Sequence, residues 1–209
     1  MNINNILQFA VASFFVLWWR EAVKGRLSAA LGDPTPARNG MLGGNPFTRI
    51  EPIGYILCVV FGFGWGRPTP TSPIYYKDKK KGQLIVHGAP ALFNLITGIL
   101  AIIIFSFRLP VLLTLADNGL ENLIFAANWL FGVIIIFARV SINVAIFNLI
   151  PVAPLDASKL LTAFARPDAA LRLSQNEKIL QLILMFLVIF GLVSMAINPI
   201  TNFIVRIFS

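Results

Sequence analysis

Two short polar segments interrupt an otherwise apolar chain. Arg20, Glu21 and Lys24 follow the first apolar run, and Arg20 and Lys24 share one helical face because residues four apart are neighbours on a helix. Asp156 ends the segment NLIPVAPLD, in which two prolines remove backbone donors and break the helix. A carboxylate near membrane depth is costly unless it binds something. These residue types therefore indicate either a metal site or a group of ion pairs.

The chain contains one histidine, His87, and one cysteine, Cys58. These counts exclude an intrachain disulfide and a zinc finger built from cysteines and histidines. No motif supports a Ser-His-Asp triad built on His87. We expect His87 to be a polar residue at the start of a membrane span and not a metal ligand.

The composition of the 209 residues is that of a membrane protein. Hydrophobic residues make up 57% of the chain and charged residues only 12%, and the mean hydropathy is +0.78. Soluble domains are nearer a quarter charged. The net charge of +8 fits Lys and Arg gathered in cytoplasmic loops. Because the basic charge is explained by membrane topology, it does not indicate nucleic acid as a partner, as it would in a soluble protein.

Four apolar runs are long enough, or nearly so, to cross a hydrocarbon core of about 30 Å. They cover residues 6–19, 84–107, 123–150 and 179–197. A fifth run, residues 53–65, has 13 residues and three glycines. We expect the fifth run to be re-entrant or interfacial.

The distribution of Lys and Arg favours one orientation. If residues 53–65 enter the membrane and return, one side holds ten basic residues in 20–83 and four in 159–178. The other side then holds only Arg108 and Arg206. Because cytoplasmic loops are the basic ones, this predicts an N-terminus outside and residues 20–83 in the cytoplasm.

The C-terminal residues predict a separate amphipathic helix. Asn198 and Pro199 have the types preferred at a helix N-cap and first position. Apolar residues then recur at helical spacing up to Phe208, which is typical of a helix lying at a membrane surface. We expect residues 1–209 to form one integral membrane domain in which 179–209 are a transmembrane helix and this tail.

Four motifs in order resemble the site-2 protease family of intramembrane zinc metalloproteases, in its short bacterial branch. They are LGDPTPARNG at 31–40, NPFTRIEPIG at 45–54, FGFGWGRPTPTSP at 61–73 and FNLIPVAPLDASKLL at 147–161. The resemblance covers most of residues 6–165. It implies an all-α polytopic core of about four to five transmembrane helices, and it implies the bacterial cytoplasmic (inner) membrane as the location.

The family's zinc ligands are missing at the matching positions. In the family, the first helix carries HExxH, whose histidines bind zinc and whose glutamate is the general base, and an LDG aspartate adds a third ligand. The resemblance places Arg20, Glu21 and Lys24 at the HExxH positions and Asp156 at the aspartate. A further family histidine is Arg49 here.

These departures argue against zinc catalysis. Protonated Arg and Lys have no lone pair to give a metal, so we expect no bound zinc and no cofactor. Arg20, Lys24, Glu21 and Asp156 sum to zero formal charge, as the family site does with its zinc. We expect them to form a closed charge cluster; the alternative is that Arg20 and Lys24 extend to the cytoplasmic interface.

Two further basic groups have no place in that site. Arg139 lies within a span, where an arginine is a partner or ligand site by default. It can face Asp156, a lipid phosphate or another subunit. Lys79, Lys80 and Lys81 precede a span and either set the topology or contact anionic lipid.

Three functions remain open. The first is a non-catalytic member of the protease fold that is a structural or accessory subunit of a membrane protein complex. The second is a pseudoprotease that binds transmembrane peptides as a regulator or chaperone. The third is an active metalloprotease with unusual ligands, which the ligand chemistry disfavours. The lipid bilayer and other membrane subunits are the expected partners.

Overall fold

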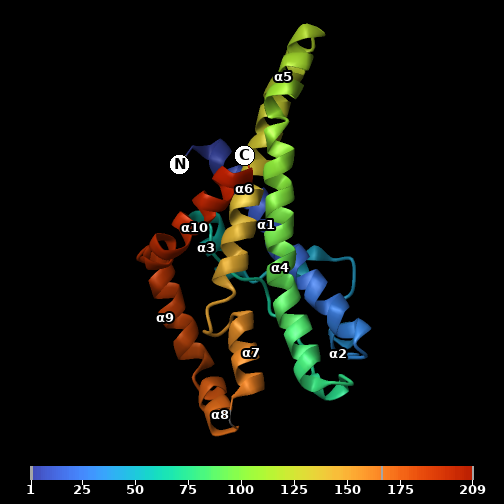
Figure 1. The fold of residues 1–209 in the computed structure, drawn as a ribbon, viewed down its shortest axis with the longest axis vertical. Coiled ribbons are helices and arrows are strands. Elements are labelled where there is room, and N and C mark those ends of the chain that lie inside the picture. Colours follow the sequence, from blue (N-terminus) through green and yellow to red (C-terminus); the bar gives the residue numbers. More distant parts are fainter. Residues whose placement is uncertain (1, 166, 209) are drawn as a thin grey trace.

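The computed structural model describes residues 2–165 and 167–208, and these residues form helices and no strand (Figure 1). Three helices have the length and apolarity of membrane spans. They are α1 (Ile3–Ala30), α4 (Lys79–Ser106), which α5 (Arg108–Asp117) continues, and α6 (Glu121–Phe147). A bent pair, α9 (Glu177–Ile189) and α10 (Leu192–Phe208), adds a fourth candidate among the described residues.

The remaining elements are short. They are α2 (Thr35–Arg38), η1 (Pro46–Arg49), α3 (Pro52–Phe61), η2 (Pro73–Tyr75), α7 (Asp156–Phe164) and α8 (Pro167–Gln175). The basic residue Arg166, which the orientation count includes, lies outside the described residues.

Helices α1, α4 and α6 pack on one another and form the centre of the molecule (Figure 1). Two buried clusters join them. One contains Leu17 of α1 and Val144 of α6, and the other contains Ile102 of α4 and Ile142 of α6. Because these faces are apolar, the three helices keep fixed positions, and those positions determine which polar side chains meet.

The connection from α1 to α4 leaves and returns at one end of the bundle. Helix α3 has 10 residues, about 15 Å of helix, which is half of a hydrocarbon core. The chain then returns in extended form, and Tyr76 meets Ser28 near the end of α1, with 2.8 Å between the two hydroxyl oxygens. The connection thus begins and ends at the same end of the helix bundle, and the re-entrant or interfacial placement of residues 53–65 stays a prediction.

Two glycines in the extended segment after α3 allow its backbone to pack closely against neighbouring residues. A Cβ on Gly64 would overlap the carbonyl oxygen of Gly54 in α3 and the Cβ of Cys58. A Cβ on Gly66 would come 2.9 Å from the carbonyl oxygen of Arg49 and 3.0 Å from Cγ of Glu21. The FGFGWG motif therefore lets the extended segment run directly against α3 and α1.

The predicted end of the chain is wrong in two respects. The run 179–197 is not one straight helix, because it breaks at Gly191 with a bend of 65°. Gly191 has a φ of 75°, a conformation that other residues avoid. In addition, Asn198 and Pro199 do not begin a helix but lie inside α10, which packs on α6.

We expect Gly44→Cys and Lys77→Cys, each in a Cys58→Ser background, to label from the same, cytoplasmic side. Both positions are exposed and lie on the connection that starts and ends at one end of the bundle. Asn118→Cys, at the other end of α4 and α5, is the control for the opposite side. The measurement is labelling by a membrane-impermeant maleimide before and after the membranes are opened. Labelling of residues 44 and 77 from opposite sides would show that the connection crosses the membrane.

Candidate functional site

Asp156 is bound by both cations of α1. Nη2 of Arg20 donates to Oδ2 of Asp156, and Nζ of Lys24 lies 2.6 Å from Oδ1. Helix α6 ends at Phe147, and the chain turns before α7 starts at Asp156. The N–H of Ala157 donates to the carbonyl oxygen of Asn148 (3.1 Å) and fixes that turn. The proline-broken segment thus delivers the carboxylate to α1.

Glu21 is the second anion of the site. Its Oε1 lies 2.5 Å from Nη1 of Arg20 and 3.2 Å from Nζ of Lys24. Its Oε2 accepts from the N–H and the hydroxyl of Thr69, each at 2.9 Å. Both oxygens are therefore fully engaged, and the extended segment after α3 is joined to α1 through Thr69.

We call Arg20, Glu21, Lys24 and Asp156 the charge cluster. All four are buried, and none is more than 4% exposed. Two cations and two anions leave the formal charge at zero. The cations face the anions inside the protein and do not extend to the interface.

His87 lies near the start of α4, as expected for a polar residue at the start of a span, and it also contacts Asp156, which the sequence did not predict. It is buried on α4, and its Nδ1 lies 3.1 Å from Oδ1 of Asp156. Asn148 was also missed: its side-chain oxygen accepts from Nη2 of Arg20 at 2.7 Å. One sequence pattern could have indicated that His87 is buried: small or polar residues recur along α4 at helical spacing. Gly82, Ala91, Asn94 and Gly98 are buried on the same helix as His87.

The other predicted residues form no hydrogen bond or ion pair with the charge cluster among the described residues. Arg49 is buried, and its Nη2 donates to the carbonyl oxygens of Met41 (2.6 Å) and Gly43 (2.9 Å). Arg139 is exposed on α6 and does not face Asp156. The three lysines 79–81 are exposed in the first turn of α4, and Nζ of Lys80 lies 5.9 Å from the centre of the Phe164 ring.

A cavity of about 420 Å³ adjoins the charge cluster. Lys24, His87 and Asp156 form part of its wall. The rest of the wall is supplied by the extended segment 68–73 and by α4 and α7. This cavity gives the charge cluster a partly polar opening to its surroundings.

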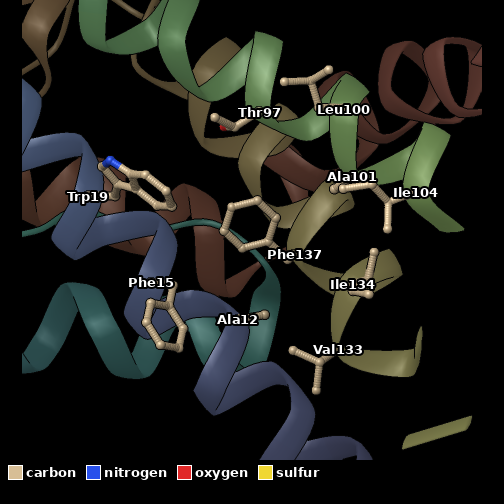
Figure 2. Close-up of a pocket in the computed structure, with 10 residues that line it drawn as sticks. All are labelled: Ala12, Phe15, Trp19, Thr97, Leu100, Ala101, Ile104, Val133, Ile134 and Phe137. Atoms are coloured by element: carbon tan, nitrogen blue, oxygen red, sulfur yellow. The ribbon is translucent and has the colours of Figure 1, made fainter. Parts of the chain in front are cut away.

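A separate apolar hollow of about 320 Å³ lies between α1, α4 and α6 (Figure 2). Figure 2 shows the rings of Phe15, Trp19 and Phe137 around it. Its one hydroxyl, on Thr97, already donates to the carbonyl oxygen of Phe93 (2.9 Å). The hollow therefore suits hydrocarbon and holds no group for chemistry.

The donor set of the charge cluster does not suit Zn²⁺. His87 and two carboxylates are present, but each carboxylate is already paired with Arg20 and Lys24. A dication would have to displace two fixed cations or sit beside them. Within the described residues, no group of three His, Cys, Asp or Glu side chains is arranged to hold a metal.

Asp33, at the end of α1, holds the connecting segment in place. Its carboxylate accepts from the N–H groups of Thr35 (2.9 Å) and Ser72 (2.7 Å) and from the hydroxyl of Ser28 (2.7 Å). Burial alone would raise the pKa of Asp33, but these hydrogen bonds outweigh it and keep the pKa below its ordinary value.

Asp33→Asn should therefore lower the free energy of unfolding at neutral pH by about 1–3 kcal/mol, and with it the melting temperature. A lowered pKa means that the ionised carboxylate stabilises the fold above its unfolded pKa of about 4 and that this stability is lost as the pH falls through the folded value. The difference between the wild type and the variant should thus shrink below about pH 4. Thermal melts in detergent from pH 3 to 8 measure it, and a constant difference would contradict this role.

One curated relative stands out in the comparison with known proteins. The chain is 27% identical over 171 residues to the "Putative zinc metalloprotease YwhC" of Bacillus subtilis (strain 168), across 82% of this chain and 75% of that protein. No family model and no solved structure matches the sequence. The chain is thus a homologue of a protein named as a metalloprotease.

Proposed function

We propose that this chain is a non-catalytic member of the site-2 protease family that acts as a structural or accessory subunit of a protein complex in the bacterial inner membrane. The order of the four motifs and the similarity to a metalloprotease homologue support the family. One observation carries the loss of catalysis: Arg20 and Lys24 hold Glu21 and Asp156 in ion pairs where the family has its histidines and zinc.

Hydrolysis of a peptide bond needs an activated water and a base that can take its proton. Glu21 is the only residue at the family's base position, and its two oxygens accept from Arg20, Lys24 and Thr69. A carboxylate held by two cations is a weak base. The side chains of the charge cluster thus do not suit the metal that would activate water, and Glu21 is not free to act as a base.

The charge cluster has a structural role in this proposal. It links α1 to α7 and, through Thr69, to the extended segment after α3. A buried charge becomes tolerable when it is paired and hydrogen-bonded. The carboxylates of the family site are therefore kept as links between helices.

The cavity beside the charge cluster supports a second candidate, a pseudoprotease that binds transmembrane peptides without cutting them. The cavity has polar and apolar walls and borders an extended segment with several prolines. Trapping of unrelated single-span peptides would favour this candidate. Co-purification of the same proteins in fixed ratio would favour the accessory subunit.

The purified protein should carry well under one zinc per chain and should not cleave a transmembrane substrate. Metal analysis after extraction in mild detergent without chelator measures the first, and a cleavage assay with an active intramembrane metalloprotease as control measures the second. Glu21→Gln is the matched variant. One zinc per chain together with cleavage that Glu21→Gln abolishes would overturn the proposal and restore the metalloprotease.

A further inference from the structure

Arg139 is exposed although it lies within a span, unlike Arg20 of α1, which is buried. It lies on the outer face of α6, and its Nη1 donates to the side-chain oxygen of Asn202 in α10 at 2.9 Å. The neighbouring pair between the same helices is buried: Thr201 donates to Asn143 at 2.6 Å. The α6–α10 contact therefore has a closed polar pair on its inner side and an open one on its outer side.

Arg139 lies well inside the apolar run 123–150, most of which α6 forms. At 1.5 Å of rise per residue, Arg139 is about 24 Å from the start of that run and about 16 Å from its end. We therefore place its side chain within the hydrocarbon core and not at the headgroups.

Helix α10 continues this exposed polar feature. Asn198, Asn202 and Arg206 recur every four residues, so they lie on one helical face, and all three are exposed. We call these residues with Arg139 the polar stripe. Within residues 2–165 and 167–208, neither Arg139 nor Arg206 forms an ion pair.

A neutral amide does not balance a guanidinium in hydrocarbon. Polar and charged residues at membrane depth usually pair with one another or face a partner. The buried charge cluster of this chain follows that rule, because each of its cations meets a carboxylate. The polar stripe departs from it and has two cations with no anion.

We propose that the polar stripe docks a transmembrane helix of a different protein, which supplies an Asp or Glu side chain at mid-depth. This inference rests on the proposed accessory role and names the surface and the partner chemistry for it. The carboxylate would pair with Arg139, and the asparagines would donate or accept hydrogen bonds along the contact. Exposed apolar groups of α10, such as Phe203 (65%), would pack against the same helix.

Charge and reach favour this occupant over the others. The nearer end of the apolar run is about 16 Å from Arg139, so a lipid phosphate lies farther away than an arginine side chain extends. A second copy of the chain offers no suitable carboxylate at mid-depth. In α1, α4, α6, α9 and α10 the acids are Glu21, which is buried, Glu121, at the start of α6, and Glu177, at the start of α9 and paired with Lys159. A foreign helix is thus the occupant that completes the charge.

Site-directed photocrosslinking of the full-length chain in its native membranes tests the proposal. A photoreactive phenylalanine analogue replaces Phe203, beside the polar stripe, or Phe125, a control that is 74% exposed near the start of α6. We expect the probe at 203 to crosslink one transmembrane segment that contains Asp or Glu, as identified by mass spectrometry. Crosslinks to lipid alone, to a second copy, or to a segment without an acid would overturn the proposal.

Arg139→Gln should reduce the crosslink at 203 by about tenfold, because the partner's carboxylate loses its counter-ion. Arg108→Gln is the matched control, since Arg108 is also exposed and also bonded to an asparagine, but at the membrane boundary. An equal yield in the wild type and Arg139→Gln would overturn the proposal. A partner that co-purifies but crosslinks only at 125 would refute this surface and leave the accessory role intact, whereas zinc-dependent cleavage would refute that role.

Discussion

Asp156→Ala is expected to lower the free energy of unfolding by about 3–5 kcal/mol. The change leaves the guanidinium of Arg20 and the ammonium of Lys24 buried with one carboxylate between them. It also removes the contact that holds α7 against α1. Thermal or denaturant unfolding in detergent measures the loss.

A balanced double change separates the charge effect from general damage. Asp156→Asn with Lys24→Gln removes one anion and one cation, and the two amides can hydrogen-bond to each other, so the pair should recover much of the loss. A double-mutant cycle gives the coupling. The half-exposed pair Lys159–Glu177 is the control, and its coupling should be at most about 1 kcal/mol. A coupling near zero between Asp156 and both cations would refute the charge cluster.

The second large effect is expected when histidines replace Arg20 and Lys24. Arg20→His with Lys24→His places two imidazoles on one face of α1 beside Asp156, which gives three ligands of the kinds that zinc prefers. Without metal, this variant has two buried carboxylates and no fixed cation. It should therefore unfold at a lower temperature than the wild type in chelator, and it should regain stability and bind about one zinc per chain when zinc is added.

The matched control is Arg20→Gln with Lys24→Gln, which removes the same charges and supplies no imidazole. It should be destabilised in the same way but should not respond to zinc. Melting curves with zinc or with chelator, together with metal analysis, distinguish the two variants. A wild-type protein that is stabilised by zinc as strongly as the double-histidine variant would contradict the interpretation of the charge cluster.

The sequence predicts the long helices well because their apolar runs are unambiguous. The runs 84–107 and 123–150 correspond to α4 and most of α6. The four residues of the charge cluster could be listed because the motifs place them in order. The contacts among these four side chains depend on tertiary structure, because α1 must pack against the start of α7 to bring them together.

Other features could not be predicted for physical reasons. The contact of His87 with Asp156 depends on the rotation of α4 about its axis, which local pattern does not determine. Proline breaks helices more strongly than glycine does, yet α10 continues through Pro199 and the break falls at Gly191. The outward direction of Arg139 depends on where α10 packs, and that follows from the same bend.

The charge cluster also constrains how the chain can change over time. Restoring one histidine alone, by Lys24→His or Arg20→His, removes a cation from a balanced site and leaves a net negative charge in the interior. A single imidazole at that position with Asp156 is too few ligands to recruit a metal in compensation. Each single step back thus costs stability and gives no activity in return. Under the proposed function, the pairing of Arg20 and Lys24 with Glu21 and Asp156 would therefore disfavour every single substitution toward a metal-binding histidine.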